Sequence, residues 1–384
     1  MKFTATPEEQ LRILSVGTAA IVSREELLHK LQKSYKTEKP LVVKLGADPS
    51  APDIHLGHTV VLQKMRQFQA LGHEVVFLIG DFTGRIGDPT GKKKTRPALT
   101  EDEVMANAET YKNQIGKILD LEKTRIVFNS EWLSKMTFVD VLKLSSQYTV
   151  ARMLERDDFS TRFKNQVPIS VVEFMYPLMQ GYDSVALKSD VELGGLDQTF
   201  NLLVGRELQR SYSQEPQITL TMPILEGLDG VEKMSKSLGN YVGINEPPDQ
   251  IYGKLMSIPD SLMMKYYELL TDFSPVELNE IREKVAVEPK NMKMKLARRL
   301  TAQYHGAKAG EDAEAGFEKM FGKTGDGLPE HIETSTLKAD GEGISLLKIL
   351  VSTGLVPSGG EARRLVTQGG VKVDQAKQSD PGKL

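Results

Sequence analysis

Two apolar segments in the first part of the chain flank an amphipathic one. Residues 41–47 (LVVKLGA) and 75–80 (VVFLIG) are apolar and β-branched enough for buried strands. Between them, apolar residues recur at helical spacing from about His55, and Gly72 supplies a stop signal. This order predicts a β-α-β unit in an α/β domain built on a doubly wound parallel sheet. Such sheets bind ligands at the loops beyond the carboxyl ends of their strands.

The rest of the chain divides by its periodicity. Residues 101–188 alternate helical stretches with short connections, and residues 247–321 are helical in pattern throughout. From Ile344 the pattern is helix, turn, helix and one short strand. This predicts a small α+β module, and we expect it to be incomplete because the chain stops soon after that strand. The predicted divisions are an α/β domain over 1–245, an α-helical domain over 246–325, a linker over 326–342 and the module over 343–384.

The composition excludes several classes of protein. No apolar run approaches the ~18 residues of a membrane helix, and the N-terminal sequence lacks the pattern of a secretory leader. We therefore expect a cytoplasmic protein without a membrane segment. The absence of cysteine excludes disulfides, thiolate zinc sites and cysteine nucleophiles. A net charge of −3 argues against a generally basic surface, so any contact with nucleic acid must come from local patches.

The first candidate for chemistry is the loop that opens the predicted helix. His55 and His58 lie three residues apart at a helix start, beside free backbone N–H groups and the positive end of the helix dipole. This arrangement suits an anion. Gly57 lies between the two histidines and leaves room for a nucleotide against the backbone. The alternative is a pair of surface histidines in a turn, because the pattern is short.

The second candidate is KMSKS, residues 233–237, which follows the apolar segment 218–225. Lys233 and Lys236 can hold phosphate groups as point charges. A loop is suitable because it can close over charge that develops only in the transition state. The alternative is a solvated basic loop. The order of the two motifs, each after an expected strand, favours a phosphate site.

HLGH followed by KMSKS resembles the signature pair of class I aminoacyl-tRNA synthetases. Three segments between them are similar to the tyrosyl branch of that family: GDPTGKKKTR from Gly87, YPLMQGYD from Tyr176 and GGLDQ from Gly194. The likeness covers about residues 35–245. It implies a Rossmann-like catalytic domain with a dimer-interface insertion over 1–245, followed by an anticodon-recognition domain over 246–325.

The resemblance also implies a reaction and its partners. The carboxylate of tyrosine would attack the α-phosphate of ATP, pyrophosphate would leave, and tyrosine would then pass to the 3′ end of tRNA(Tyr). Mg2+ would travel with ATP, so no dedicated protein metal site is expected. The family is homodimeric, and the likeness places the interface in the region from Glu131 to Arg162.

The same likeness assigns roles to individual residues. His55 and His58 would stabilise the phosphates in the transition state, and Lys233 and Lys236 would close over the leaving pyrophosphate. The implied ATP-binding residues are Ser50, His55, Gly57, His58, Gly195, Asp197, Lys233, Met234, Ser235, Lys236 and Ser237. The implied tyrosine-binding residues are Asp88, Tyr176, Gln180, Asp183 and Gln198.

Tyr176, Gln180 and Asp183 have the spacing of one helix face. Pro177 is expected near the start of that helix or at a kink in it. In the family pattern Tyr176 and Gln180, together with Asp88, hold the substrate ammonium, and Asp183 accepts a hydrogen bond from the phenol. The alternative is an ordinary amphipathic helix, which does not account for three polar residues on one line.

One position departs from the family pattern. Many bacterial tyrosyl enzymes have a tyrosine that helps to bind the phenol at the position where this chain has Lys44. Lys44 is therefore a further candidate for tyrosine binding. Its place in the first strand also suggests a charge pair with Asp81, which follows the second strand.

The C-terminal pattern SxxEARRLVxQGGVxV resembles the RNA-binding fold shared by ribosomal protein S-four and pseudouridine synthases. Arg363 and Arg364 lie on its second helix, where guanidinium groups can contact RNA phosphates. A solvated helix face is the alternative. Lys92 and Arg96 belong to a basic loop that the family likeness places near pyrophosphate or the acceptor end of RNA. A solvated charge run is again the alternative.

Three other functions stay open at this point. Another nucleotidyltransferase could use HxGH, but KMSKS and the RNA-binding module count against it. A catalytically silent RNA-binding relative is a second choice, and the intact histidines and lysines of both motifs argue against that loss. A tryptophanyl enzyme is the third, although Asp183 with GGLDQ favours a phenol over an indole.

Overall fold

The computed structural model describes most of the 384 residues. The described ranges are 3–49, 53–87, 100–321, 335–338, 343–356, 358–374 and 376–382. The chain divides into two compact units, residues 1–322 and residues 323–384. No helix in the described ranges has both the length and the apolar character needed to cross a membrane.

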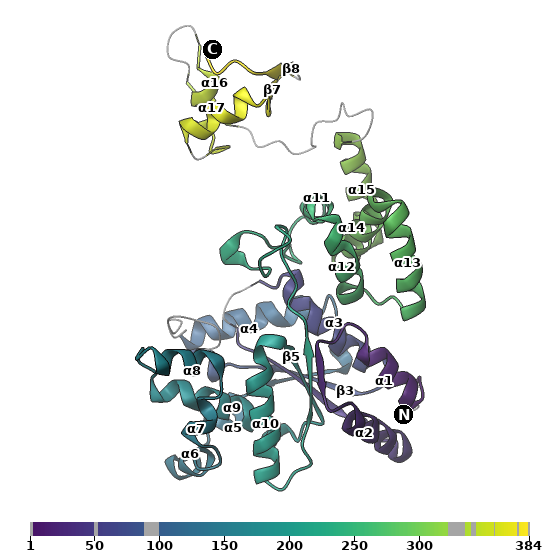
Figure 1. The fold of residues 1–384 in the computed structure, drawn as a ribbon, viewed down its shortest axis with the longest axis vertical. Coiled ribbons are helices and arrows are strands. Elements are labelled where there is room, and N and C mark those ends of the chain that lie inside the picture. Colours follow the sequence, from purple (N-terminus) through teal and green to yellow (C-terminus); the bar gives the residue numbers. More distant parts are fainter. Residues whose placement is uncertain are drawn as a thin grey trace. The chain divides into compact units, whose positions relative to one another are not determined.

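The first unit is built on a six-stranded sheet (Figure 1). Its strands in spatial order are β1 (Ala20–Val22), β6 (Ile218–Met222), β5 (Val191–Gly195), β2 (Val42–Ala47), β3 (Glu74–Ile79) and β4 (Thr124–Phe128). All neighbouring pairs are parallel except β1 with β6, which is antiparallel. The strand order reverses between β2 and β5, and ligands of doubly wound sheets bind at such a switch point.

The predicted β-α-β unit is confirmed. Strands β2 and β3 are parallel, and helix α3 (Leu56–Ala70) connects them. The helix was expected from about His55, and His55 caps its start. Gly72 follows the end of the helix with a φ of +96°, a conformation that residues other than glycine rarely adopt.

Alternate residues of β2 face different helix layers, because successive side chains of a strand point to opposite faces. Val43 and Leu45 belong to one large buried cluster with residues of α3 and of α4 (Glu101–Ile115). Lys44 points the other way and bonds to helix α9 (Val171–Leu187). Helix α10 (Thr199–Ser211) packs closely on α9 and contacts β5 and β6. The sheet is thus covered by helices on both faces.

The region from 101 to 188 contains a strand that the sequence pattern did not predict. Strand β4 pairs in parallel with β3 and forms an edge of the sheet. It is short and only two of its five residues are buried, so its apolar signal resembles that of the helical segments around it. The expectation of helices and connections alone was therefore wrong here. Besides α4 and α9, the α-helices of this region and of the N-terminus are α1 (Pro7–Ser15), α2 (Arg24–Thr37), α5 (Ser130–Leu133), α6 (Phe138–Ser145), α7 (Val150–Met153) and α8 (Asp157–Lys164).

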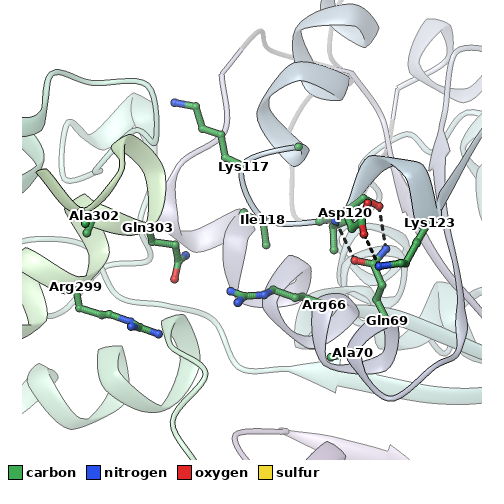
Figure 2. A pocket seen from close by; sticks show the side chains of 13 residues that line it. Arg66, Gln69, Ala70, Lys117, Ile118, Asp120, Lys123, Arg299, Ala302 and Gln303 are labelled. Atoms are coloured by element: carbon green, nitrogen blue, oxygen red, sulfur yellow. Dashed lines mark hydrogen bonds and ion pairs between the residues drawn. The ribbon is translucent and has the colours of Figure 1, made fainter. Parts of the chain in front are cut away.

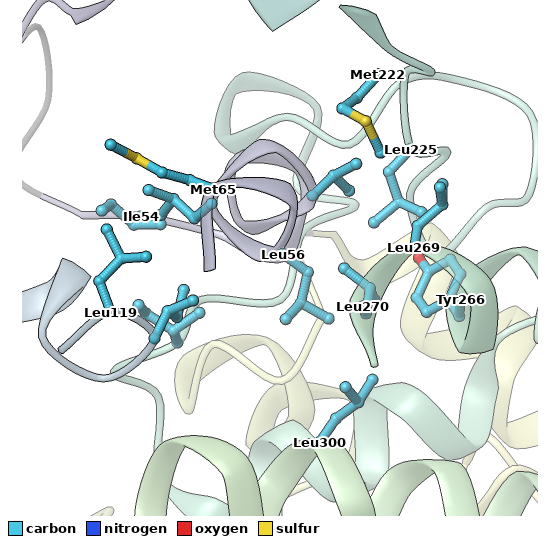
Figure 3. Packing of buried hydrophobic residues seen from close by; sticks show 14 of the residues in the cluster. Ile54, Leu56, Met65, Leu119, Met222, Leu225, Tyr266, Leu269, Leu270 and Leu300 are labelled. Carbon is cyan, nitrogen blue, oxygen red and sulfur yellow. The ribbon is translucent and has the colours of Figure 1, made fainter. Parts of the chain in front are cut away.

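The segment after the sheet is helical throughout, as predicted. It comprises α11 (Pro248–Ser257), α12 (Met263–Leu270), α13 (Pro275–Val287), α14 (Pro289–His305) and α15 (Ala307–Phe321). One hydrophobic cluster continues from α3 into these helices, and Figure 3 shows Leu56 beside Leu270, with Leu300 beyond them. Both parts belong to one compact unit, and a domain boundary at residue 245 stays a prediction.

The second unit has a small core of its own. Helices α16 (Leu346–Ser352) and α17 (Gly359–Thr367) pack together, and strands β7 (Val371–Val373) and β8 (Ala376–Gln378) form an antiparallel pair. The core residues are Leu346, Leu350, Val356, Ala362, Val366 and Val371. Helix, turn, helix and strand occur in the predicted order. A second short strand, β8, follows the one that the sequence pattern indicated.

Candidate active site

The HLGH turn begins shortly beyond strand β2 and positions both histidines through the backbone. Nδ1 of His55 accepts the backbone N–H of Gly57 at 3.2 Å, and Nδ1 of His58 accepts the backbone N–H of His55 at 3.3 Å. An amide N–H can only donate, so neither Nδ1 carries a proton. The neutral form of each ring therefore has its proton on Nε2. Both side chains are set to donate a hydrogen bond from that atom.

Burial keeps His55 in the neutral form. The side chain is 7% exposed, and desolvation, followed by the nearby His58 and Lys236, lowers the pKa of His55 to about 3. The ring is consequently an uncharged donor at neutral pH. A side chain at Gly57 would meet this ring at 3.0 Å and the Cβ of Met234 at 3.5 Å. The glycine thus lets the two motifs approach each other.

Backbone hydrogen bonds join the HLGH turn to the segment after KMSKS. Leu56 N donates to Val242 O at 2.9 Å, and Ile244 N donates to Ile54 O at 3.1 Å. The loop adds a side-chain link, because Lys236 Nζ lies 2.9 Å from a carboxylate oxygen of Asp53. The structure therefore brings together two motifs that lie far apart in the sequence.

One side of the KMSKS loop faces solvent, and the other side is anchored to the protein. Met234 is buried, whereas Lys233 is exposed. Asn240 is the anchor: its Oδ1 accepts the backbone N–H of Ser235 at 2.8 Å, and its Nδ2 donates to Lys233 O at 3.2 Å and to the carboxylate of Asp229. The loop ends in a left-handed turn at Gly239, with a φ of +68°. Sequence reasoning missed Asn240, which lies three residues beyond the motif.

Helix α9 carries the three predicted tyrosine-binding residues on one face, as expected. The Tyr176 hydroxyl donates to Asp48 at 2.6 Å, and Thr83 Oγ1 donates to the other oxygen of the same carboxylate at 2.7 Å. Asp48 follows β2 directly, which is the signal that could have singled it out. Pro177 lies inside α9 rather than near its start.

An asparagine joins the middle of this helix to the loop after β5. Asn201 Nδ2 donates to the side-chain oxygen of Gln180 at 2.9 Å and to that of Gln198 at 3.2 Å. Beside them, a side chain at Gly195 would meet a carboxylate oxygen of Asp197 at 2.5 Å, and Asp197 itself is exposed. The predicted residues of GGLDQ thus lie at the switch point of the sheet, next to α9.

Asp183 is the most deeply buried of the predicted tyrosine-binding residues on α9. It accepts hydrogen bonds from Trp132 Nε1 at 2.8 Å and from Asn129 Nδ2 at 3.4 Å, and it is 2% exposed. Desolvation raises the pKa of Asp183 to about 7, although the Lys44 charge and these two hydrogen bonds act in the opposite direction. No motif singles out Asn129 in the sequence. Trp132 stands out only as the single tryptophan of the chain.

The suggested pair of Lys44 with Asp81 was wrong. Lys44 Nζ lies 2.9 Å from a carboxylate oxygen of Glu192 on β5, whereas Asp81 accepts hydrogen bonds from Ser130 at 2.9 and 2.5 Å. Lys44 points into the layer beneath α9, and Asp81 follows β3 on the way to the neighbouring helix α5. The partner of a strand residue depends on the strand order, which the local pattern did not contain.

Several predicted site residues lie outside the described ranges: Ser50, Asp88, Lys92 and Arg96. Arg363 and Arg364 belong to the second unit, where both are exposed on α17 and Arg364 pairs with Glu361 at 3.3 Å. Their roles stay predictions.

A cleft of about 610 Å³ lies at the other end of α3 from the HLGH turn. Arg66 of α3 and Gln303 of α14 come from opposite walls of it (Figure 2). Arg66 lies ten residues beyond Leu56, or about 15 Å along a helix that rises ~1.5 Å per residue. This cleft is therefore separate from the site formed by the two motifs.

Comparison with known proteins defines the class. The family described as tRNA synthetases class I (W and Y) matches residues 36–322, so the chain belongs to this class. The tyrosine–tRNA ligase of Geobacter sulfurreducens is 59% identical over 97% of this chain and 93% of its own length. That of Moorella thermoacetica is 59% identical over 97% and 90%, respectively. Within the class, the chain is a member of the bacterial tyrosyl-tRNA synthetase family.

Solved structures and the second unit agree with this assignment. A tyrosyl-tRNA synthetase from Archaeoglobus fulgidus, complexed with L-tyrosine, has a TM-score of 0.64 at 25% identity and covers 80% of this chain and 99% of its own. A C-terminally truncated mitochondrial enzyme from Aspergillus nidulans shares the fold, with a TM-score of 0.69 at 23% identity over 82% of this chain and 94% of its own. The S4 domain matches residues 345–384, which confirms the predicted RNA-binding module.

Proposed function

We propose that this chain activates tyrosine with ATP, releases pyrophosphate, and transfers the tyrosyl group from the adenylate to the 3′ end of tRNA(Tyr). The observation that carries the proposal is the junction of HLGH and KMSKS, which hydrogen bonds hold together at the switch point of the sheet. Membership of the tyrosyl-tRNA synthetase family supports the same activity.

In the activation step, a carboxylate oxygen of tyrosine attacks the α-phosphorus of MgATP. The bond from that phosphorus to the bridging oxygen breaks, and pyrophosphate leaves with the electron pair. His55 and His58 donate from Nε2 to phosphate oxygens, and the neutral state of His55 avoids a reorganisation of its charge as the reaction proceeds. Lys233 and Lys236 contact the departing pyrophosphate, for which Lys236 exchanges its partner Asp53.

The side chain of the substrate tyrosine lies along helix α9. Tyr176 and Gln180, with Asp88, hold the ammonium group, and Asp183 accepts the hydrogen bond of the phenol. The hydrogen bonds of Tyr176 to Asp48 and of Gln180 to Asn201 support these positions before substrate arrives. Phenylalanine would leave the buried carboxylate of Asp183 without that partner, which disfavours its binding.

The tRNA contacts use three further parts of the chain. The helical segment over 246–325 binds the anticodon region, and Arg363 and Arg364 of the S4 domain contact RNA phosphates. Both arginines are exposed on one helix, which supports this role. Lys92 and Arg96 act near the acceptor end of the RNA.

The chain works as a homodimer in the cytoplasm. Support comes from large apolar side chains that are exposed on α6, α7 and α8 and at the start of α9: Phe138, Val139, Leu142, Val150, Phe163, Val171 and Val172. Exposed apolar side chains that gather in one region are typical of an interface between subunits.

Exchange of labelled pyrophosphate into ATP tests the proposal, with tyrosine, phenylalanine and tryptophan supplied separately. We expect exchange with tyrosine alone, and subsequent charging of tRNA(Tyr). Exchange driven by tryptophan would reassign the substrate. The absence of exchange with all three amino acids would refute the activation step.

A further inference from the structure

A lysine and a glutamate form a fully buried ion pair directly behind the tyrosine-binding helix. Lys44 of β2 and Glu192 of β5 are register partners in the parallel sheet. Both side chains are 1% exposed, and Nζ lies 2.9 Å from Oε1. The pair sits at the switch point between β2 and β5, where the strand order reverses.

The hydrogen bonds of this pair end on helix α9. Lys44 Nζ donates to Ser184 Oγ at 2.8 Å and to the backbone oxygen of Gln180 at 3.3 Å, so its three protons all have acceptors. Ser184 Oγ in turn donates to Glu192 at 2.9 Å, and Gln217 donates to the same carboxylate. The network is closed within the protein and leaves no donor of the ammonium for a substrate.

Stability alone does not account for such a pair. Two charges removed from water lose their hydration, and well-packed apolar side chains of the same size often stabilise a fold equally well or better. The contacts point instead to a role in the site, because the groups that Lys44 touches on α9, Gln180 and Ser184, flank Asp183 along the turn.

Asp183 responds to the charges of both partners. Its own hydrogen bonds come from Trp132 on α5 and from Asn129 before that helix, both uncharged groups. Among the charged groups around it, Lys44 from β2 lowers the pKa of Asp183 and Glu192 from β5 raises it. The two ends of one ion pair thus act on the same carboxylate with opposite sign.

We propose that Lys44 and Glu192 are a positioning pair that sets how strongly Asp183 accepts a hydrogen bond, and thereby the preference of the site for tyrosine over phenylalanine. This inference rests on the proposed role of Asp183 as the acceptor of the phenol. A phenol O–H bonds more strongly to an ionised carboxylate than to a protonated one. Lys44 favours the ionised form, while the bonds to Gln180 and Ser184 hold the turn that presents it.

The sign of the pH dependence follows. Because the pKa of Asp183 is about 7, the group is mostly protonated at pH 6 and mostly ionised at pH 8. The KM for tyrosine should therefore fall as pH rises through this range. Phenylalanine has no hydroxyl, so its KM should not follow the same curve, and selectivity for tyrosine should rise with pH.

The test measures the KM for tyrosine in pyrophosphate exchange from pH 6 to 9 in three variants. Lys44→Met removes the charge that favours ionisation, so the midpoint of the KM curve should move to higher pH by about one unit, which corresponds to a roughly fivefold higher KM near pH 7. Glu192→Gln removes the opposing charge, so its midpoint should move to lower pH. Lys44→Met/Glu192→Gln should lie between the two single variants.

Lys30→Met is the matched control. Lys30 is also a buried lysine, 3% exposed, and its partners Asp190 and Glu215 are both outside α9. Its loss should lower the melting temperature and leave the midpoint unchanged. If Lys44→Met does not fold, Glu192→Gln still decides the question, because glutamine keeps the size and the acceptor of the side chain.

Opposite displacements of the midpoint in the two single variants would support the proposal. A raised KM with the same midpoint in both variants would overturn it and leave the pair a purely structural role. A different result would refute the proposed function itself: no pyrophosphate exchange with tyrosine by the wild-type protein.

Discussion

Gly80 ends strand β3 at a point where other groups already fill the space beside its Cα. A Cβ there would lie 2.1 Å from a carboxylate oxygen of Asp48 and 2.4 Å from Thr83 Oγ1. These are the two groups that hold each other and, through Asp48, the hydroxyl of Tyr176. The hydrogen atom of glycine is thus a requirement of the site and not of the turn alone.

Gly80→Ala should displace the Asp48 carboxylate and with it Tyr176. We expect a loss of about 1–3 kcal/mol in the free energy of unfolding, as for other overpacked sites, together with a higher KM for tyrosine. Chemical denaturation and exchange kinetics measure the two effects. Gly316→Ala is the control, because a Cβ at this position of α15 would meet nothing within 4 Å, and it should stabilise the helix by up to about 1 kcal/mol. An unchanged KM in Gly80→Ala would contradict the assigned role of Asp48.

Residues that belong to short local patterns could be predicted from the sequence. The spacing within HLGH and KMSKS was enough to predict His55, His58, Lys233 and Lys236, because neighbouring residues in the sequence form each turn. The partner of Lys44 could not be predicted in this way. Glu192 lies 148 residues further along the chain, and only the order of the strands makes the two neighbours.

The side chain of Asn240 helps to fix the shape of the KMSKS loop. Asn240 bonds the backbone of the loop at Ser235 and at Lys233 and connects both to Asp229. Asp229 in turn accepts the backbone N–H groups of Val231 and Glu232, each at 2.8 Å. The loop is therefore preorganised near its two ends, while Lys233 stays exposed.

Asn240→Ala should remove this preorganisation without touching the tyrosine pocket. We expect kcat for exchange to fall on the order of tenfold, since the lysines would no longer be held over the phosphates, with little change in the KM for tyrosine. Asn245→Ala provides the control, because Asn245 is exposed five residues further on and should leave both constants as they are. A rise in the KM for tyrosine as the main effect would count against the role given to the loop.

Among the helices and strands, the sequence predicted those with a strong apolar pattern. β2 and β3 were found because each is a nearly continuous apolar run, and α3 and the later helical segment were found because their apolar residues recur at helical spacing. β4 was missed, since an edge strand of five residues with two buried positions has no clear alternation. Pro177 lies inside α9 and not near its start, and the expected kink at this proline stays a prediction.

The division into two compact units allows the RNA contacts of the S4 domain to be tested separately from the chemistry. The S4 domain has its own core, and its exposed Arg363 differs from the neighbouring Arg364, which is paired with Glu361. Arg363→Gln should raise the KM for tRNA and reduce the slope of log affinity against log salt by about one, while pyrophosphate exchange stays at the wild-type rate. Arg364→Gln should have a smaller effect. Equal charging of tRNA by Arg363→Gln and wild type at all salt concentrations would exclude this contact.

The continuous core of the first unit limits how such a protein can be recombined. Leu56 follows His55 directly and belongs to one buried cluster with Leu270 and Leu300 of the helical segment, and the Tyr304 hydroxyl donates to Thr59 Oγ1 of α3 at 3.3 Å. A graft of helices from a relative would replace one wall of a close-packed interior and leave the other wall unmatched. Substitutions in the helical segment must therefore be matched by substitutions in α3. The turn that begins at His55 thus depends on the helices that pack beneath it.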